Sequence, residues 1–493
     1  MRRRLVVWSG LMLVCATSAA CGGGSAEPDA ASAPDAAIPG SCSPSAGTRL
    51  APQGWALEGG ERVATGWFDG ERGEACAFTP DADGKLRCLP TQLVATAFGD
   101  YFLDEACTEA ASLLPGATCD GEEVKYVATT RYELCASRTE LRPVETLIDT
   151  GGGRLIYQRD TAGGCLLAGT VTTERLARLG APIAPASFVS AILAPGDARG
   201  RLAPLVLTAD DGAVDPCPRE TGGQLEDVPR GATCTLARSI DGAERCLPVA
   251  AQLTGSFADA ACTAPLAFED PSCPAPTFAS EARSDGCALS YEVRPVTAPI
   301  AVYYGLDAGT TCTPVDVGLD AGYYAVGAPE DPGGFEKLTL MAAPRDGRLA
   351  PLVWSTIDGA ELSTGRFADA ELAGEPCDVR VAADGVPRCL PAPAGFGVQD
   401  AFRDAACLES VVVAAVDATC VTDAKYVTAT APGTTCGTNL ERVYRVTGEL
   451  QAVYASDGVG GCGAVALGAE GLFLLSLEEV PPETFVSASP TRW

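Results

Sequence analysis

Histidine is absent from all 493 residues of this chain. The imidazole ring is the commonest general base, the commonest metal ligand and the side chain that titrates nearest to neutral pH. Its absence excludes serine and cysteine nucleophiles activated by histidine, zinc sites with imidazole ligands, and haem with a histidine axial ligand. We therefore expect no cofactor and no bound metal.

Positive charge is also scarce. The chain has 35 lysine and arginine residues against 64 aspartate and glutamate residues, which gives a formal charge of −29. Such an acidic surface repels phosphate backbones, so we expect no nucleic-acid partner, and its simplest role is to keep the protein soluble. The apolar run at residues 5–14 is too short to span a bilayer as a helix.

The start of the chain has the layout of an export signal. Three arginines at residues 2–4 precede the apolar run, and small residues from Ala16 to Ala20 follow it. A charged region, an apolar region and a small-residue cleavage site are the three parts of a signal peptide. We assign residues 1–20 to it.

Ser18-Ala19-Ala20-Cys21 resembles the cleavage box of bacterial lipoproteins, in which the cysteine carries the lipid. That box usually has leucine where Ser18 stands, and ordinary signal peptidase would also accept this segment, so simple secretion is the alternative. Residues 21–47 are rich in Gly, Ala, Ser, Pro and Asp, as a flexible tether is. A tether suits an anchored protein, and Gly22 is typical of lipoproteins sent to the outer membrane. We expect lipidation of Cys21 and attachment to the outer membrane or cell surface.

Cysteines are abundant, with 22 in the chain. Apart from Cys15 in the leader and Cys21, an even number remains, which predicts disulfides in an exported protein. Eighteen fall into three sets of six whose successive gaps are 12, 19, 12, 16, 30, then 12, 16, 11, 14, 25, then 12, 18, 13, 16, 26. The C-x-x-C spacing of metal knuckles does not occur. The sets are Cys76, Cys88, Cys107, Cys119, Cys135, Cys165; Cys234, Cys246, Cys262, Cys273, Cys287, Cys312; and Cys377, Cys389, Cys407, Cys420, Cys436, Cys462.

Six cysteines allow 15 pairings, and the sequence alone cannot choose among them. Proximity along the chain favours first with second, third with fourth and fifth with sixth. Each loop of about 15 residues closed in this way stabilises the fold by roughly 3 kcal/mol in the chain-entropy model. Cys42 and Cys217 are left to pair with each other.

Three motifs occur three times each. The motif Arg-Leu-Ala-Pro starts at Arg49, Arg201 and Arg348, which gives periods of 152 and 147 residues. Asp-Gly-x-x-Arg-Cys-Leu-Pro occupies 83–90, 241–248 and 384–391, and Phe-x-Asp-x-Ala-Cys occupies 102–107, 257–262 and 402–407. A regular period indicates a structural unit copied in tandem. We predict modules at 48–197, 198–344 and 345–493.

The local pattern favours an all-β fold. Short apolar runs such as 205–208, 301–304, 411–416 and 472–477 are separated by Gly, Pro and Asp turns. The repeated Asp-Gly reads as a hairpin turn rather than as the calcium loop that Asp81 suggests. Each module divides into three parts, and four short strands per part fit propeller-like blades. Three β-trefoil-like domains are the alternative.

The repeated polar residues read as structural. Trp55, Leu207 and Trp354 share one place after the Arg-Leu-Ala-Pro arginine, and exchange with leucine favours a core position over a sugar-stacking platform. Two further sets recur in every module: Asp104, Asp259 and Asp404, and Arg87, Arg245 and Arg388. An active site usually occurs once, so we interpret the aspartates as turn residues. We expect the arginines to pair with a local carboxylate rather than with an acidic ligand.

The leader, Gly-Trp-Phe-Asp at 66–69, the repeated motifs and the closing Phe-Val-Ser-Ala at 485–488 together resemble cysteine-rich repeat lipoproteins of myxobacteria. The resemblance implies no activity, and the middle module lacks Gly-Trp-Phe-Asp. We expect a non-catalytic binding or structural scaffold whose partner is an extracellular glycan or protein, with specificity in loops such as 216–232. The alternative is an extracellular, glycosidase-like hydrolase with paired carboxylates. No residue stands out as catalytic.

Overall fold

The computed structural model describes residues 43–493 except 93, 97–99, 115–123, 134–135, 161–162, 173–174, 218–223, 272, 285–287, 308–310, 319–320, 345–346, 393–397, 418–424, 433–438, 451, 457–461 and 465–471. The predicted signal peptide, residues 21–42 of the tether and part of the loop 216–232 lie outside the described residues. So do eight of the cysteines named above: Cys15, Cys21, Cys42, Cys119, Cys135, Cys287, Cys420 and Cys436.

The described residues form an all-β protein, which confirms the predicted fold class, and they contain no α-helix. The apolar runs used for that prediction fall within strands or begin one residue before them. Short 3-10 helices are the other described elements: η1 (Pro185–Ser187), η3 (Pro332–Gly334), η4 (Ala370–Leu372) and η6 (Pro482–Thr484). No helix among the described residues is long and apolar enough to cross a membrane.

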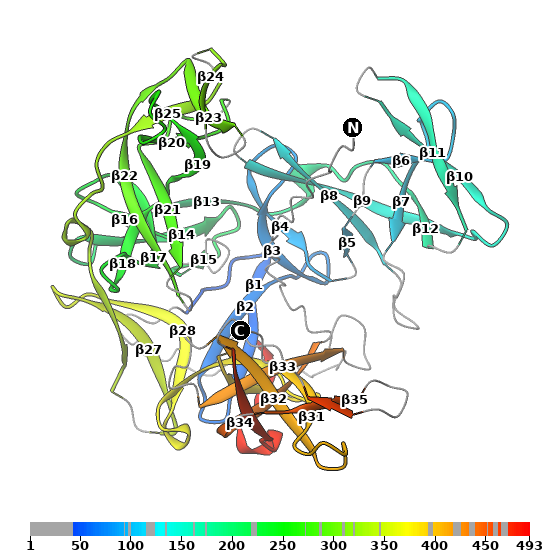
Figure 1. Ribbon diagram of the computed structural model, residues 1–493. Helices are drawn as coiled ribbons and strands as arrows, with labels where there is room; N and C mark the ends of the chain where they lie inside the picture. The colour runs from blue at the N-terminus through cyan, green and yellow to red at the C-terminus, as the bar shows by residue number, and fades with distance from the viewer. Residues whose placement is uncertain are drawn as a thin grey trace.

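One antiparallel strand pattern occurs three times around the molecule (Figure 1), and we call each copy a central sheet. The first two copies are joined through β4 and β13 into one 11-stranded sheet, and the third is a five-stranded sheet. The first consists of β38 (Ala488–Arg492), β1 (Leu50–Leu57), β2 (Arg62–Asp69), β3 (Glu74–Pro80) and β4 (Leu86–Pro90). The second consists of β13 (Ser190–Pro195), β14 (Leu202–Ala209), β16 (Leu225–Asp227), β17 (Ala232–Arg238) and β18 (Glu244–Pro248), with β15 (Val214–Asp215) beside β14. The third consists of β26 (Leu338–Ala342), β27 (Leu349–Thr356), β28 (Glu361–Asp369), β29 (Glu375–Val381) and β30 (Pro387–Pro391).

After the last strand of each pattern (β4, β18 and β30) the chain leaves to form an outer sheet, and it returns as the first strand of another pattern (β13, β26 and β38). The first outer sheet contains β5 (Val94–Thr96), β6 (Tyr101–Phe102), β7 (Ala110–Leu114), β8 (Tyr126–Glu133), β9 (Ala136–Ile148), β10 (Arg154–Arg159), β11 (Cys165–Val171) and β12 (Arg175–Leu179). The second contains β19 (Ala251–Phe257), β20 (Pro265–Phe268), β21 (Phe278–Ser284), β22 (Leu289–Pro299), β23 (Val302–Asp307), β24 (Thr311–Asp316) and β25 (Tyr323–Val326). The third contains β31 (Val398–Phe402), β32 (Ser410–Asp417), β33 (Tyr426–Pro432), β34 (Asn439–Leu450), β35 (Tyr454–Ser456), β36 (Cys462–Ala464) and β37 (Leu472–Glu479).

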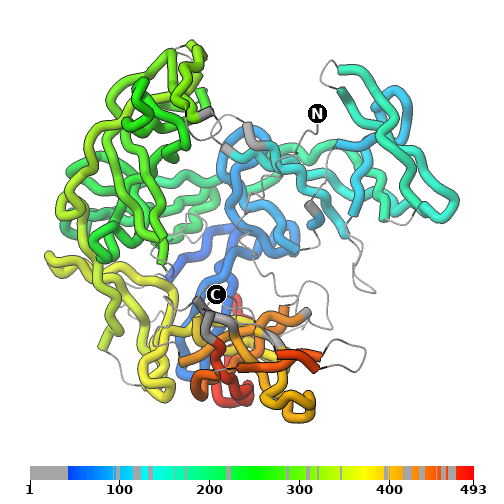
Figure 2. Tube along the Cα trace, in the orientation of Figure 1, coloured from blue at the N-terminus to red at the C-terminus, as the bar shows by residue number. Residues whose placement is uncertain are grey.

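The central sheets follow one another in a closed circuit. Strand β4 pairs with β13, and isolated bridges join Arg245 to Lys337 and Arg388 to Ser487. The C-terminal strand β38 pairs antiparallel with β1 near the start of the described chain, and Figure 2 shows the C-terminus beside these blue strands. The strands therefore assemble into central and outer sheets rather than into nine separate four-stranded blades.

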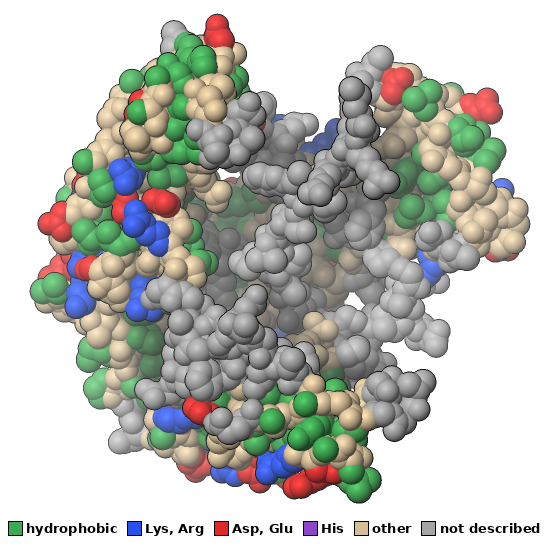
Figure 3. Space-filling model, viewed as in Figure 1, with side chains coloured by type: hydrophobic (Ala, Val, Ile, Leu, Met, Phe, Trp, Pro, Cys, Tyr) green, Lys and Arg blue, Asp and Glu red, His purple; other side chains and the backbone are tan. Residues whose placement is uncertain are grey.

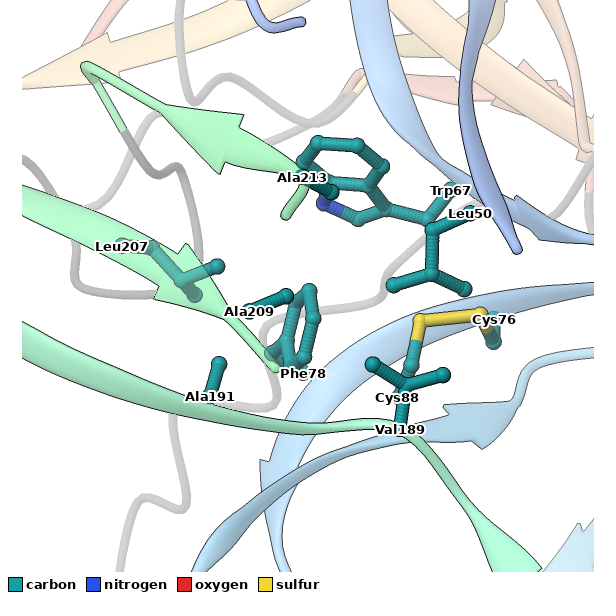
Figure 4. Packing of buried hydrophobic residues seen from close by; sticks show 10 residues of the cluster. All are labelled: Leu50, Trp67, Cys76, Phe78, Cys88, Val189, Ala191, Leu207, Ala209 and Ala213. Carbon is teal, nitrogen blue, oxygen red and sulfur yellow. A yellow bond between two sulfur atoms is a disulfide. The ribbon is translucent and has the colours of Figure 1, made fainter. Parts of the chain in front are cut away.

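The junctions between central sheets hold the core, and each contains one disulfide. In the first, Trp67 lies edge-on to Phe78 with ring centroids 6.0 Å apart, beside the Cys76–Cys88 bridge and Leu207 of the second sheet (Figure 4). Burying a side chain of this kind stabilises the fold by roughly 1.5–3 kcal/mol. Trp55, Leu207 and Trp354 were predicted to share a core position. Leu207 is buried in this junction, and Trp55 and Trp354 pack against the other two junctions, as expected.

The disulfides agree with the predicted pairing in part. The first and second cysteines of each set are bonded across a hairpin: Cys76–Cys88, Cys234–Cys246 and Cys377–Cys389. The third cysteine bonds the sixth, so the expected pairings of third with fourth and of fifth with sixth were both wrong: Cys107–Cys165, Cys262–Cys312 and Cys407–Cys462. The cause is sheet pairing, since β6 pairs with β10 and brings the β10–β11 hairpin to the third cysteine. Cys217 and Cys273 are disulfide-bonded as well.

Candidate functional site

The arginine of each Arg-Leu-Ala-Pro motif binds a buried aspartate. Arg49 donates from Nε and Nη2 to Asp69, at 2.8 and 2.6 Å, and the Asp69 side chain is 0% exposed. The other two motifs repeat this bidentate pair as Arg201–Asp227 and Arg348–Asp369. Burial alone would raise the pKa of Asp69, but the hydrogen bonds from Arg49 and from backbone N–H groups lower it.

Sequence reasoning missed these aspartates, although a signal for them existed. They follow the motif arginines by 20, 26 and 21 residues. Asp69 is the last residue of Gly-Trp-Phe-Asp, and Asp227 is what the middle module keeps of that stretch. An acid that recurs 20 to 26 residues after a repeated arginine predicts a repeated ion pair.

The arginines of the Asp-Gly-x-x-Arg-Cys-Leu-Pro motif are engaged as well. Arg87 donates to Asp83 at 2.8 Å and to the carbonyl oxygen of Phe188 at 3.1 Å. Arg245 and Arg388 make the equivalent bonds to the aspartate four residues earlier and to a later phenylalanine carbonyl. Gly84 has φ +79° in the hairpin turn between β3 and β4, as predicted. This motif therefore fastens each hairpin to the strand that returns from the outer sheet.

The repeated acids of the Phe-x-Asp-x-Ala-Cys motif stabilise a turn. Asp104 Oδ1 accepts hydrogen bonds from the backbone N–H groups of Thr108 at 2.8 Å and Glu109 at 2.7 Å. These bonds favour the ionised carboxylate and lower the pKa of Asp104. Cys107 has a φ of 53° in this turn, which presents its sulfur to Cys165. Asp259 and Asp404 make the same turns and have lowered pKa values for the same reason.

One polar depression lies beside the first central sheet, and its volume is about 540 Å³. It is lined by Arg49, Glu71, Arg72, Glu74, Tyr126, Ala186 and Ser187. The turn between β2 and β3 supplies two of these residues, β3 and β8 supply one each, and the rest come from the segment before β1 and from η1. We call this site the Arg49–Arg72 depression.

The charged groups of the depression bind one another. Arg49 Nη1 lies 2.8 Å from Glu71 Oε2, and Arg72 Nε donates to Glu74 Oε1 at 2.5 Å. Arg72 Nη2 donates to the Tyr126 hydroxyl at 2.9 Å, and that hydroxyl lies 3.2 Å from Glu74 Oε2. Burial opposes the charge of Arg72, but its hydrogen bond and ion pair with Glu74 outweigh this effect and raise its pKa. The pKa of Tyr126 is raised mainly by burial and also by the negative charge of Glu74. Both groups are therefore protonated at neutral pH.

The other central sheets keep only part of this arrangement. The strand partner of the buried aspartate is Glu74 in the first sheet, Ala232 in the second and Glu375 in the third. Arg72 corresponds to Arg230 in the second sheet. The guanidinium of Arg72 lies 4.7 Å from the centre of the Phe188 ring, and that of Arg230 lies 4.5 Å from the centre of the Phe335 ring. In the third sheet a buried residue, Leu372, stands at this place. Among the described residues, the full set of two arginines, two glutamates and a tyrosine therefore belongs to the first module, with the tyrosine on the outer-sheet strand β8.

This arrangement can hold a polar ligand. Three carboxylates, counting buried Asp69, face two guanidinium groups, so the depression carries a small negative charge. Glu71 and Glu74 line the same depression, which is the pairing that a hydrolase would need. No group of three or more cysteine, aspartate or glutamate residues able to hold a metal ion occurs in the described part of the chain. On the face shown in Figure 3, acidic and basic side chains are interspersed.

The chain belongs to a family of unknown function (DUF7481), which matches residues 31–452. Comparison with curated proteins and with solved structures found no match. The matched range includes the Arg49–Arg72 depression and most of the closed circuit of sheets, but β38, which completes that circuit, lies beyond it.

Proposed function

We propose that this protein is a non-catalytic binding and scaffold protein that acts outside the cytoplasm. One observation carries the proposal: the charged residues of all three repeated motifs are engaged inside the structure, in bidentate pairs, hairpin anchors and turns. Residues used in this way hold strands together and are not free for chemistry. Six disulfide bridges are described with both of their cysteines, and disulfides form and persist in oxidising compartments.

The location follows from the leader together with the disulfides. We propose that the mature chain begins at a lipidated Cys21 and is displayed at the outer membrane or cell surface, as in the myxobacterial lipoproteins that its motifs resemble. The tether at 21–47 would then lead to modules 48–197, 198–344 and 345–493, each supplying an outer sheet and most strands of one central sheet. Intact mass of the N-terminal peptide from membranes tests this proposal. A diacylglyceryl cysteine is expected, whereas an unmodified cysteine or another cleavage site leaves secretion.

A glycosidase-like hydrolase is the second candidate, because Glu71 and Glu74 line one depression. Such an enzyme needs one protonated carboxylic acid beside one carboxylate. Each of these glutamates is held by an arginine, at 2.8 and 2.5 Å, and Tyr126 with a raised pKa is a poor acid. The acidic groups that line the depression are therefore engaged with one another rather than presented to a leaving group.

A substrate screen separates the two candidates. The oxidised mature chain is incubated with glycoside, ester and peptide substrates, beside variants Glu71→Gln and Glu74→Gln. The scaffold proposal expects no turnover above the buffer control. Turnover that either substitution abolishes would establish the hydrolase instead.

A further inference from the structure

We propose that the Arg49–Arg72 depression binds a neutral oligosaccharide through adjacent hydroxyl groups. This inference rests on the proposed binding function and names its ligand class. A volume of about 540 Å³ lies within the range of small-molecule sites, roughly 300–1,000 Å³. Among the described residues, Arg72 and Glu74 occur together in the first module alone, because alanine replaces the glutamate in the second and leucine replaces the arginine in the third. The repeated framework therefore does not explain this combination.

The charges of the depression select a neutral ligand. Asp69, Glu71 and Glu74 outnumber Arg49 and Arg72, and the whole chain carries a charge of −29, so an anion is repelled. A cation would have to lie beside two guanidinium groups that already bind the carboxylates. A hydroxyl group avoids both costs, because it donates to a carboxylate and accepts from a guanidinium or phenol.

The geometry suits pairs of neighbouring hydroxyls. Glu74 and Arg72 are planar groups held side by side by the 2.5 Å bond, and the Tyr126 hydroxyl touches both. Glu71 is 72% exposed in its side chain, yet Arg49 holds its Oε2, so the carboxylate is presented to solvent in a defined position. Adjacent hydroxyls on a sugar ring can bridge such acceptor and donor groups at once.

The side chains are organised before any ligand arrives. Arg49 is held by buried Asp69 and by the carbonyl oxygen of Ser187 at 3.0 Å, while Arg72 lies over the Phe188 ring at 4.7 Å. A site whose long side chains are already ordered loses less conformational entropy on binding. This matters for a sugar, since each of its hydrogen bonds replaces one to water.

The chain itself supplies tolerated substitutions for the test. Leucine stands at the place of Arg72 in the third sheet, and alanine at the place of Glu74 in the second. Arg72→Leu therefore removes a ligand contact from a chain that we expect to fold, and Glu71→Gln removes another at a side chain that is 72% exposed. Arg230→Leu is the matched control, because it removes the equivalent arginine from its Phe335 contact outside the depression.

The experiment is calorimetric titration of the oxidised mature chain, carrying Cys21→Ser for solubility, with short oligosaccharides of glucose, mannose, galactose and N-acetylglucosamine. A uronic acid oligosaccharide is the charged comparison. At least one neutral oligosaccharide should bind more tightly than the uronic acid one. Arg72→Leu should weaken this binding roughly tenfold or more, and Glu71→Gln should weaken it as well, because each removes a hydrogen bond to a charged group. Arg230→Leu should bind as the parent chain does.

Other outcomes overturn the inference in distinguishable ways. If no neutral oligosaccharide binds a chain that circular dichroism shows to be folded, the ligand class is wrong, while the absence of turnover would still support the scaffold. If binding survives both Arg72→Leu and Glu71→Gln, the sugar binds elsewhere and the depression is not its site. If an oligosaccharide binds and is cleaved, the non-catalytic function fails although the ligand class stands.

Discussion

Replacing buried Asp69 by asparagine should destabilise the protein substantially without changing its shape. The carboxylate is 0% exposed and accepts two hydrogen bonds from Arg49, together with backbone N–H groups of Glu71 at 3.0 Å and Arg72 at 3.2 Å. Asparagine has the same size, but it lacks the charge and places an amide N–H₂ group against a guanidinium. Arg49 then keeps only Glu71 and a carbonyl oxygen as partners.

The expected loss is about 3 kcal/mol, the lower end of the range for breaking a buried ion pair, because Arg49 retains other partners and is 22% exposed. A change of 1 kcal/mol shifts the midpoint of thermal unfolding by about 2–4 °C in a unit of 150–250 residues. The midpoint of Asp69→Asn should therefore fall by about 6–12 °C. Guanidinium titration with intact disulfides, followed by tryptophan fluorescence, measures the loss directly.

The same variant should show a distinctive pH dependence. The pKa of folded Asp69 lies below its ordinary value of 3.8. A carboxyl group with a lowered folded pKa stabilises the protein above its unfolded pKa, and this stabilisation is lost as pH falls through the folded value. The stability difference between parent and Asp69→Asn should therefore be full at pH 5–7 and shrink below pH 3.8.

Glu478→Gln is the control, because Arg445 and Glu478 form a pair with side chains 59% and 60% exposed. Exposed ion pairs contribute little, so this variant should unfold at the same denaturant concentration as the parent. Equal midpoints for Asp69→Asn and Glu478→Gln would refute the claim that the buried pair holds the first central sheet. A difference that persisted unchanged at acid pH would refute the electrostatic part alone.

Three further outcomes are expected. Peptide mapping without reduction should recover Cys107 linked to Cys165; a Cys107–Cys119 peptide would contradict the sheet pairing that places them. Deleting residues 488–493 removes β38 and opens the circuit, so the thermal midpoint should fall on the order of 5–10 °C and proteolysis should speed up; unchanged behaviour would show that closure contributes nothing. Gly84→Ala forces a left-handed residue at φ +79° and should cost roughly 1–2 kcal/mol in guanidinium titration, whereas Gly152→Ala, with nothing close to its added methyl, should be nearly neutral.

The parts of the fold that could be predicted are those encoded locally. The Asp-Gly turn predicts the β3–β4 hairpin because the glycine conformation and the flanking strands lie within a few residues. The bond between the first and second cysteines follows from that same hairpin. The Cys107–Cys165 bond could not be predicted in this way, because its 58-residue separation is closed by pairing between β6 and β10. Chain distance says nothing about which strands become neighbours.

Closure of the circuit is likewise invisible to a repeat analysis. Strand β38 belongs in sequence to the third module but pairs in the first central sheet, from Gln53 opposite Arg492 to Leu57 opposite Ala488. A module boundary derived from motif spacing assigns each strand by its position in the sequence and not by the strand with which it pairs. The corresponding strands β13 and β26 also pair forward, with β14 and β27. Each central sheet is therefore built from two sequence modules, which makes the modules structurally interdependent.

The residues that repeat and those that do not repeat carry different information about function. An arginine such as Arg49 is present in every module because a buried aspartate needs it, and its presence predicts a framework rather than a ligand. Arg72 and Glu74 attract no attention in the sequence, since an arginine and a glutamate two residues apart are common in an acidic chain. They become a candidate site only when Tyr126, 54 residues after Arg72, is brought against them by the packing of β8 on the β2–β3 turn. A binding site that depends on a combination of residues from a central and an outer sheet can change in one module while the framework of all three is kept. The depression, rather than the motifs, is therefore the place to look for specificity.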